Sequence, residues 1–255
     1  MSSPAPEPIR VDPAPFDLPG DGRAAALCLH GLTGTPWEVR SLGLALSARG
    51  VRAVGPALPG HNETPERLAK VGFRDWLAAA REGLDALRAR HGTVFLVGMS
   101  MGGLLSLALA AEARVEGLVV VGTPLHLRRG LAPALPLLRR LRPFARKRVG
   151  SDIRDAEARA RHPSYPVMPL ASLQQLARLQ CEVRRLLPRV EAPLLVAPGA
   201  FDGTANPADA REILSAVGSR EKQLLILASS GHVVPVDFDG PELARAAADF
   251  LARRM

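Results

Sequence analysis

Cysteine is scarce in this chain of 255 residues. The two cysteines, Cys28 and Cys181, lie far apart, and no histidines accompany them at the spacing of zinc ligands. Neither a disulfide framework nor a metal site is therefore indicated. This cysteine usage fits a reducing cytoplasm, and the sequence predicts neither a metal nor another cofactor.

Long apolar runs are absent as well. No stretch of eighteen uninterrupted apolar residues occurs, and the first eight residues, MSSPAPEP, lack the basic start and apolar stretch of a secretory signal. These absences argue against a membrane span and against export. Hydrophobic residues still make up 47% of the chain, which is enough for a buried core.

Aromatic residues are few, at 4%, although the net charge is +8. The charge is concentrated: residues 124–190 hold 15 basic and 4 acidic side chains, a net charge of +11, and the rest of the chain carries −3. That basic stretch contains only Phe144 and Tyr165 for stacking on bases. Nucleic acid is therefore not the expected partner, and the excess of arginine over lysine indicates a compositional bias.

Short apolar segments alternate with longer amphipathic ones. Continuous hydrophobicity is typical of parallel strands covered on both faces, and the alternation predicts an α/β fold with a doubly wound, mostly parallel sheet. The strands are expected at Ala25–Leu29, Val51–Val54, Val94–Val97, Leu118–Val121, Leu194–Ala197 and Leu224–Leu227, with an edge strand at Phe16–Leu18. The helices are expected at Trp37–Arg49, Phe73–Arg90, Met101–Ala111, Pro207–Val217 and Pro241–Arg254.

One connection is much longer than the others. Nearly seventy residues separate the strand that ends at Val121 from the one that begins at Leu194, too many for a structureless loop. Residues 124–190 are therefore predicted to form a small helical lid, with helices at Ala156–Arg161 and Leu170–Leu187. The remaining parts are a flexible segment, 1–14, and a core made of 15–123 and 191–255.

The sequence GMSMGG at 98–103 stands between a predicted strand and a predicted helix. A serine on such a tight turn is held in a strained backbone with its oxygen exposed, and its glycine neighbours avoid collisions with the strand and helix. Ser100 is accordingly the candidate nucleophile. The alternative is a serine that merely caps a helix.

A serine hydroxyl needs a base, and the base needs an orienting carboxylate. His232 follows the last strand, and Asp202 follows the strand at Leu194–Ala197, so both lie at the edge of the sheet where ligands bind. Asp237 and Asp239 are the competing acids. The other histidines are expected to be solvated or locally bonded, with His30 holding a loop; they are His30, His61, His91, His126 and His162.

Two backbone N–H groups must bind the oxyanion of the tetrahedral intermediate. Met101, at the start of its helix, is expected to supply one, and Leu32 in the loop HGLTGTP at 30–36 the other. Gly31 and Gly34 are expected to let this backbone approach the substrate closely. The loop has no phosphate-binding Gly-Lys-Ser/Thr, which argues against nucleotide hydrolysis.

These motifs resemble the α/β-hydrolases, and among them the bacterial carboxylesterases related to monoacylglycerol lipases. The resemblance rests on HGLTGTP at 30–36, LPGH at 58–61, GMSMGG at 98–103, PGAFD at 198–202 with Asn206 and Pro207, and SGHV at 230–233 with Asp237. It implies the α/β-hydrolase fold, a triad of Ser100, Asp202 and His232, and oxyanion donors at Leu32 and Met101. Two departures are Asn62, where many relatives have glycine, and Phe201 before the acid.

The resulting expectation is a serine hydrolase of short- to medium-chain carboxylic esters, such as monoacylglycerols, that acts through an acyl-enzyme. The same residues would also serve a thioesterase, an acyltransferase, a carbon–carbon bond hydrolase or a ligand receptor with little turnover. Leu131–Phe144 alternates leucines with arginines, which suggests either contact with lipid surfaces or anionic esters, or leucines packed on the core beneath a solvated face.

Overall fold

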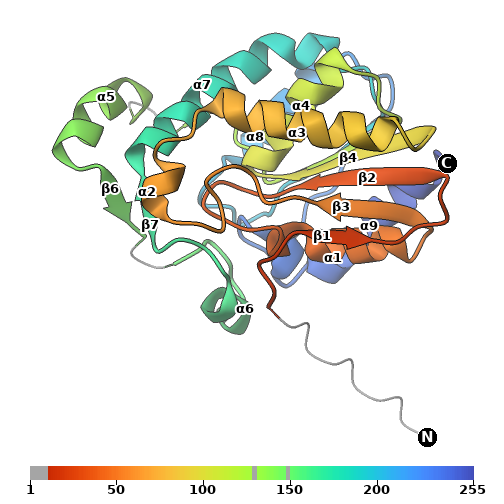
Figure 1. Ribbon diagram of the computed structural model, residues 1–255, viewed down its shortest axis with the longest axis horizontal. Coiled ribbons are helices and arrows are strands. Elements are labelled where there is room, and N and C mark those ends of the chain that lie inside the picture. Colours follow the sequence, from red (N-terminus) through yellow and green to blue (C-terminus); the bar gives the residue numbers. More distant parts are fainter. Residues whose placement is uncertain (1–10, 128–130, 148–149) are drawn as a thin grey trace, which may run out of the picture.

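A mostly parallel sheet of seven strands organises the chain (Figure 1). The computed structural model describes residues 11–127, 131–147 and 150–255. The strand order is β1-β3-β2-β4-β5-β8-β9, and only the edge strand β1 is antiparallel to its neighbour. The doubly wound sheet predicted from the sequence is confirmed. The strands are β1 (Phe16–Leu18), β2 (Ala24–Leu29), β3 (Val51–Gly55), β4 (Thr93–Met99), β5 (Gly117–Val121), β8 (Leu194–Ala197) and β9 (Lys222–Leu224).

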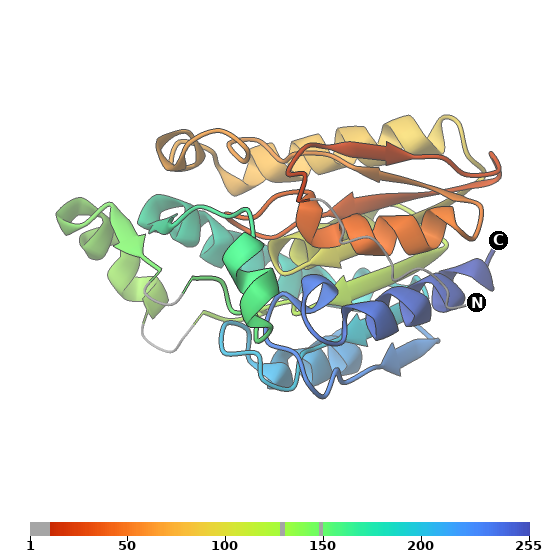
Figure 2. The same ribbon diagram turned by 90° about the horizontal axis from the view of Figure 1, so that it is seen from below.

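The sheet is buried because helices cover both of its faces. Every residue of β2 is buried, and alternate side chains enter two separate apolar clusters, one on each face. Helices α3 (Phe73–Arg88), α4 (Met101–Glu112), α7 (Leu170–Leu186) and α8 (Pro207–Ala216) supply one cluster. Helices α1 (Trp37–Ser47) and α9 (Gly240–Ala252) supply the other and lie against each other (Figure 2).

Helix α3 shows how sequence pattern becomes packing. Its buried residues Trp76, Ala80, Leu84 and Leu87 recur at helical spacing, and most of its exposed positions are polar. The carboxylate of Asp75 accepts the N–H of Gly72 at 2.8 Å and thereby caps the first turn. The helix therefore buries one stripe against the sheet.

Two local features differ from the sequence prediction. The last strand, expected at Leu224–Leu227, is β9 at Lys222–Leu224, and Leu227 continues along the sheet only as an isolated bridge to Gly199. This edge strand has a partner on one side only, and Ile226 is 52% exposed. A prediction from apolar residues alone therefore placed the strand too far toward the C-terminus. The short helix α2 (Pro65–Leu68), capped by Thr64, is too short to give a periodic signal.

The stretch 124–190, here called the insert, leaves the sheet after β5 and returns at β8. The views of Figures 1 and 2 both place α5, β6 and β7 at one end of the molecule, and α6 lies closer to its middle. The two short strands pair antiparallel and were not predicted, because three residues each give no pattern. The elements are α5 (Leu131–Leu141), β6 (Phe144–Arg146), α6 (Ala156–Arg161), β7 (Val167–Pro169), α7 and a 3₁₀ turn, η1 (Leu187–Arg189).

Helix α5 is loosely covered. Leu135 is fully buried, whereas Leu137 and Leu141 are 64% and 75% exposed and lie near Arg139 and Arg140. Among the helices of the described ranges, none has the length and apolarity needed to cross a bilayer. The predicted segment 1–14 lies outside the described residues except for its last four positions.

Candidate active site

Ser100 occupies a strained turn between β4 and α4. Its backbone has φ 55° and ψ −116°, and its N–H donates to the carbonyl of Val121 at 2.8 Å. A Cβ on Gly98 would lie 2.2 Å from the carbonyl oxygen of Gly102, and one on Gly102 would lie 2.0 Å from that of Leu29. Strand, serine and helix can therefore approach this closely only with glycine at both positions.

His232 links Ser100 to Asp202. The Ser100 hydroxyl donates to Nε2 of the ring at 2.9 Å, and Nδ1 donates to Oδ2 of Asp202 at 2.8 Å. All three side chains are buried. Burial disfavours charge on the ring, but the neighbouring Asp202 carboxylate outweighs it and raises the pKa of His232 above its usual value. The ring is thus oriented and prepared to accept a proton.

Asp202 is itself held in place by backbone groups. Its second oxygen accepts the N–H groups of Thr204 at 2.9 Å and Ala205 at 2.7 Å. The competing acids are used elsewhere: Asp237 accepts backbone N–H groups, including those of Arg154 and Gly231, and Asp239 caps the turn before His232. The structure brings Asp202, and neither competitor, to the histidine.

The loop that holds Leu32 leaves one N–H group open between two that are occupied. The Gly31 N–H donates to Oε2 of Glu38 at 2.7 Å, and the Thr33 N–H donates to Nε2 of His61 at 3.2 Å. Within the described ranges, the N–H groups of Leu32 and Met101 have no acceptor. Both are available to bind an oxyanion.

Two histidines support this loop as neutral rings. His30 accepts the N–H of Leu58 at 3.1 Å, and its other nitrogen donates to the carbonyl of Gly31 at 2.9 Å. Burial lowers the pKa of His30, and it lowers the pKa of His61 to about 3. Neither ring can act as an acid near neutral pH, in line with the loop-holding role expected for His30.

Glu38 and His162 form a buried pair that the sequence analysis did not identify. Nε2 of His162 donates to Oε1 of Glu38 at 3.1 Å, and the side chains are 2% and 4% exposed. The open side of Gly34 faces this carboxylate, because a Cβ there would lie 2.0 Å from Oε1. The expectation that Gly34 admits substrate was therefore wrong: its missing side chain makes room for Glu38.

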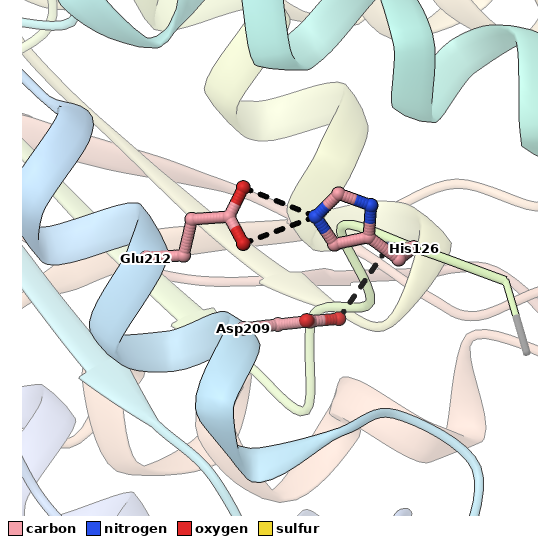
Figure 3. Close-up of side chains that lie close together, drawn as sticks. All are labelled: His126, Asp209 and Glu212. Carbon is pink, nitrogen blue, oxygen red and sulfur yellow. Dashed lines mark hydrogen bonds and ion pairs between the residues drawn. The ribbon is translucent and has the colours of Figure 1, made fainter. Parts of the chain in front are cut away.

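A third cluster joins the start of the insert to α8 (Figure 3). The carboxylate oxygens of Glu212 both lie 3.0 Å from Nε2 of His126, while Asp209 accepts the backbone N–H groups of Leu125 and His126. The potential ligand atoms of these side chains lie within 4.8 Å of one another. Hydrogen bonds among these side chains and to the backbone explain why they lie close together. They tether the start of the insert to α8.

The Ser100 hydroxyl opens into a cavity of about 780 Å³ beneath the insert. This volume lies within the usual range for small-molecule sites. Core residues, including Leu32 and His232, form part of the wall, and the insert provides the rest. The apolar side chains of the insert that line it are Pro124, Leu127, Leu131, Ile153, Met168, Leu173 and Leu176.

Comparison with known proteins agrees with this architecture. The sequence model of the serine aminopeptidase S33 family matches residues 20–239. A thermostable monoacylglycerol lipase of Bacillus sp. (strain H-257) is 32% identical over 91% of this chain and 92% of its own length. A carboxylesterase of Bacillus subtilis (strain 168) is 30% identical over 89% and 91%.

Solved structures show the same fold. One from work on LipS and LipT, two metagenome-derived lipolytic enzymes, has a TM-score of 0.89 and 28% identity, covering 95% of this chain and 98% of that one. The monoacylglycerol lipase of Paleococcus ferrophilus has a TM-score of 0.82 at 18% identity over 94% and 98%. The family model covers most of the chain, and the curated relatives align over about nine-tenths of it. This protein therefore belongs to the serine aminopeptidase S33 family of α/β-hydrolases.

Proposed function

We propose that this protein hydrolyses carboxylic esters through an acyl-enzyme formed on Ser100. The observation that carries the proposal is the hydrogen-bonded line from Ser100 through His232 to Asp202, at 2.9 and 2.8 Å, with two unoccupied N–H groups beside it. Relatives named monoacylglycerol lipase and carboxylesterase support the same chemistry.

In the first half of the reaction, Ser100 Oγ attacks the ester carbonyl while its proton passes to Nε2 of His232. The carbonyl oxygen becomes an oxyanion that accepts the N–H groups of Leu32 and Met101. Asp202 stabilises the imidazolium through its bond to Nδ1. Collapse of this intermediate breaks the bond to the alcohol oxygen, which takes the proton from Nε2 and leaves.

In the second half, a water molecule loses a proton to Nε2 of His232 and attacks the acyl carbonyl. The same N–H groups hold the second oxyanion, and the proton returns to Ser100 as the acid is released. Each turnover consumes one ester and one water. No step requires a metal or cofactor, because the proton and the negative charge are handled by these groups.

We further propose that the insert, residues 124–190, acts as a lid over the core formed by 15–123 and 191–255. Its apolar side chains line the cavity above Ser100, which suits an acyl chain of short to medium length, as in small esters and monoacylglycerols. An activity series over esters of increasing chain length tests this part. Equal rates from two to sixteen carbons would contradict it.

The family description names an aminopeptidase, but the cavity is poorly suited to the free amino terminus of a peptide. Binding an ammonium group calls for a carboxylate with free oxygens. Both oxygens of Glu38 are committed to Gly31 and His162, and Oδ2 of Asp152 accepts the Gly203 N–H and the Thr204 hydroxyl. The basic side chains of Lys147, Arg154 and Arg159 line the same cavity and disfavour a second cation. We therefore expect esters, and not aminoacyl anilides, to be hydrolysed.

The test compares p-nitrophenyl butyrate with alanine p-nitroanilide. The wild-type protein should turn over only the ester, and Ser100→Ala should lower kcat by a factor on the order of 10⁶, as in a comparable triad. Ser215→Ala, on the outer helix α8, is the matched control and should retain the activity. Ester turnover by Ser100→Ala at the wild-type rate would refute the proposal.

A further inference from the structure

The cavity wall contains a partly buried ammonium group beside the oxyanion-binding loop. Nζ of Lys147 donates to Oγ1 of Thr33 at 2.7 Å and to Oγ of Ser164 at 3.4 Å. Thr33 follows Leu32 directly, so the cation lies one residue from a proposed oxyanion donor. Burial lowers the pKa of Lys147, and the charge of Glu38 partly opposes that effect.

The ammonium group of Lys147 has no carboxylate partner among the described residues. Its two partners are hydroxyl groups, and within the part of the chain that the structure describes no carboxylate comes within 4 Å of its Nζ. A lysine has three donors and no acceptor, so a third donor remains for a ligand. Removing a cation from water without an adjacent anion is costly even when its burial is partial, which makes the position of Lys147 on a cavity wall informative.

Two more cations line the same cavity nearer to solvent. Arg154 and Arg159 bind backbone carbonyls, of Ser229 and Ile153 respectively, and likewise have no carboxylate within 4 Å among the described residues. Arginines elsewhere on the surface do find acids, for example Arg52 with Asp17 at 2.7 Å. Other exposed arginines, such as Arg178 and Arg185, likewise have no carboxylate within 4 Å among the described residues, so the partial burial of Lys147 is what distinguishes this wall.

The acids of the cavity wall are already engaged in hydrogen bonds. Oε1 and Oε2 of Glu38 accept N–H groups from His162 and Gly31, and Oδ2 of Asp152 accepts two donors near the Asp202 turn. A substrate that enters the cavity therefore meets an ammonium donor on Lys147 and the guanidinium groups of Arg154 and Arg159, while both oxygens of Glu38 already accept hydrogen bonds. Such a site favours a negatively charged group.

We propose that the preferred substrates are esters that carry an anionic oxygen group, a carboxylate or a phosphate, and that Lys147 binds this group. The proposal rests on the ester hydrolysis proposed above and names its substrate class. Arg154 and Arg159 at the mouth attract the anion, and Lys147 holds it beside the Leu32 loop while Ser100 attacks the ester carbonyl.

Two matched substrate pairs test the proposal and distinguish where the anion lies. Mono-p-nitrophenyl glutarate is compared with p-nitrophenyl pentanoate, which has the same chain without the acyl-side carboxylate. A 1-acylglycerol 3-phosphate is compared with the corresponding 1-monoacylglycerol, which lacks the alcohol-side phosphate. For each pair, the ratio of kcat/KM for the anionic ester to that for the neutral ester is measured in wild type and variants.

In Lys147→Met this ratio should fall about tenfold for at least one pair, the usual effect of losing a hydrogen bond to a charged group. Lys147→Arg keeps the charge and should retain most of the ratio. Arg146→Met removes a neighbouring, exposed cation that does not line the cavity and serves as the control. Turnover of the neutral esters reports whether each variant is folded.

The outcomes separate the two proposals. If Lys147→Met lowers the anionic-to-neutral ratio of kcat/KM about fivefold or more for either pair, Lys147 has a role in binding the anion. The pair whose ratio falls shows whether a carboxylate or a phosphate is bound. A smaller change in both pairs overturns the inference while leaving ester hydrolysis intact. If the wild-type protein turns over none of the four esters, the proposed function itself fails.

Discussion

Glu38 makes the free energy of unfolding of the protein depend on pH in the acidic range. Its carboxylate is fully buried, yet the hydrogen bond and electrostatic attraction from His162, together with the hydrogen bond from Gly31, overcome that burial and lower its pKa from 4.5 to about 2. The unfolded chain therefore binds the Glu38 proton more tightly than the folded protein. Stability from this group is complete above pH 4.5 and is lost as the pH falls toward 2.

The size of the effect follows from the shift in pKa. Each unit corresponds to about 1.4 kcal/mol, so the whole contribution is roughly 3 kcal/mol, of which about 1 to 2 kcal/mol is lost by pH 3.5. That is a large share of the 5–15 kcal/mol that typically separates folded from unfolded domains. Glu38→Gln removes this titration because an amide does not ionise.

Urea denaturation of wild type and Glu38→Gln between pH 6 and pH 3.5 provides the assay. The difference in free energy of unfolding should be largest at pH 6 and narrow by about 1 to 2 kcal/mol at pH 3.5. Glu157→Gln, an exposed change on α6, controls for the removal of one carboxylate. A difference between wild type and Glu38→Gln that does not vary with pH would refute this reasoning.

Three further predictions concern the site. Asp202→Asn should lower kcat about 10⁴-fold in ester kinetics, the size seen in a comparable triad, whereas Asp237→Asn should act mainly on thermal stability; equal effects on kcat would contradict the assignment. Because the pKa of His232 is raised and its neutral form is the base, kcat/KM for a neutral ester should rise with pH to a plateau, with a midpoint above about 6.5; a midpoint below 6 would contradict this. Gly102→Ala should cost roughly 1–3 kcal/mol or more in urea denaturation, since its Cβ would lie 2.0 Å from the Leu29 carbonyl oxygen, whereas Gly92→Ala meets nothing within 4 Å and should be tolerated.

The parts of the site that could be predicted are those with a local sequence signature. GMSMGG at 98–103 specifies a turn whose strain and crowding depend on adjacent residues, so the geometry of Ser100 was accessible without a structure. Asp202 and His232 each follow a strand, and parallel strands bring their carboxyl ends to one edge. The position of each residue at the end of a strand was therefore enough to predict that these three side chains lie close together.

The parts that were missed depend on contacts between distant segments. Nothing near Glu38 indicates that His162 lies against it, because the pairing requires the insert to fold back over α1. Lys147 is one of many basic residues in the insert, and only the structure distinguishes it from the exposed Arg146 beside it. The antiparallel strands β6 and β7 were missed for a similar reason, since each is three residues long and is defined by its partner.

The central claim is that Ser100 is the nucleophile activated by His232. Labelling the wild-type protein with a fluorophosphonate, followed by peptide mapping with mass spectrometry, tests it directly. One adduct per chain is expected, on the peptide that contains Ser100, and it should form in step with the loss of ester hydrolysis. An adduct on another residue that abolishes activity, or full activity in a protein fully labelled at Ser100, would contradict it.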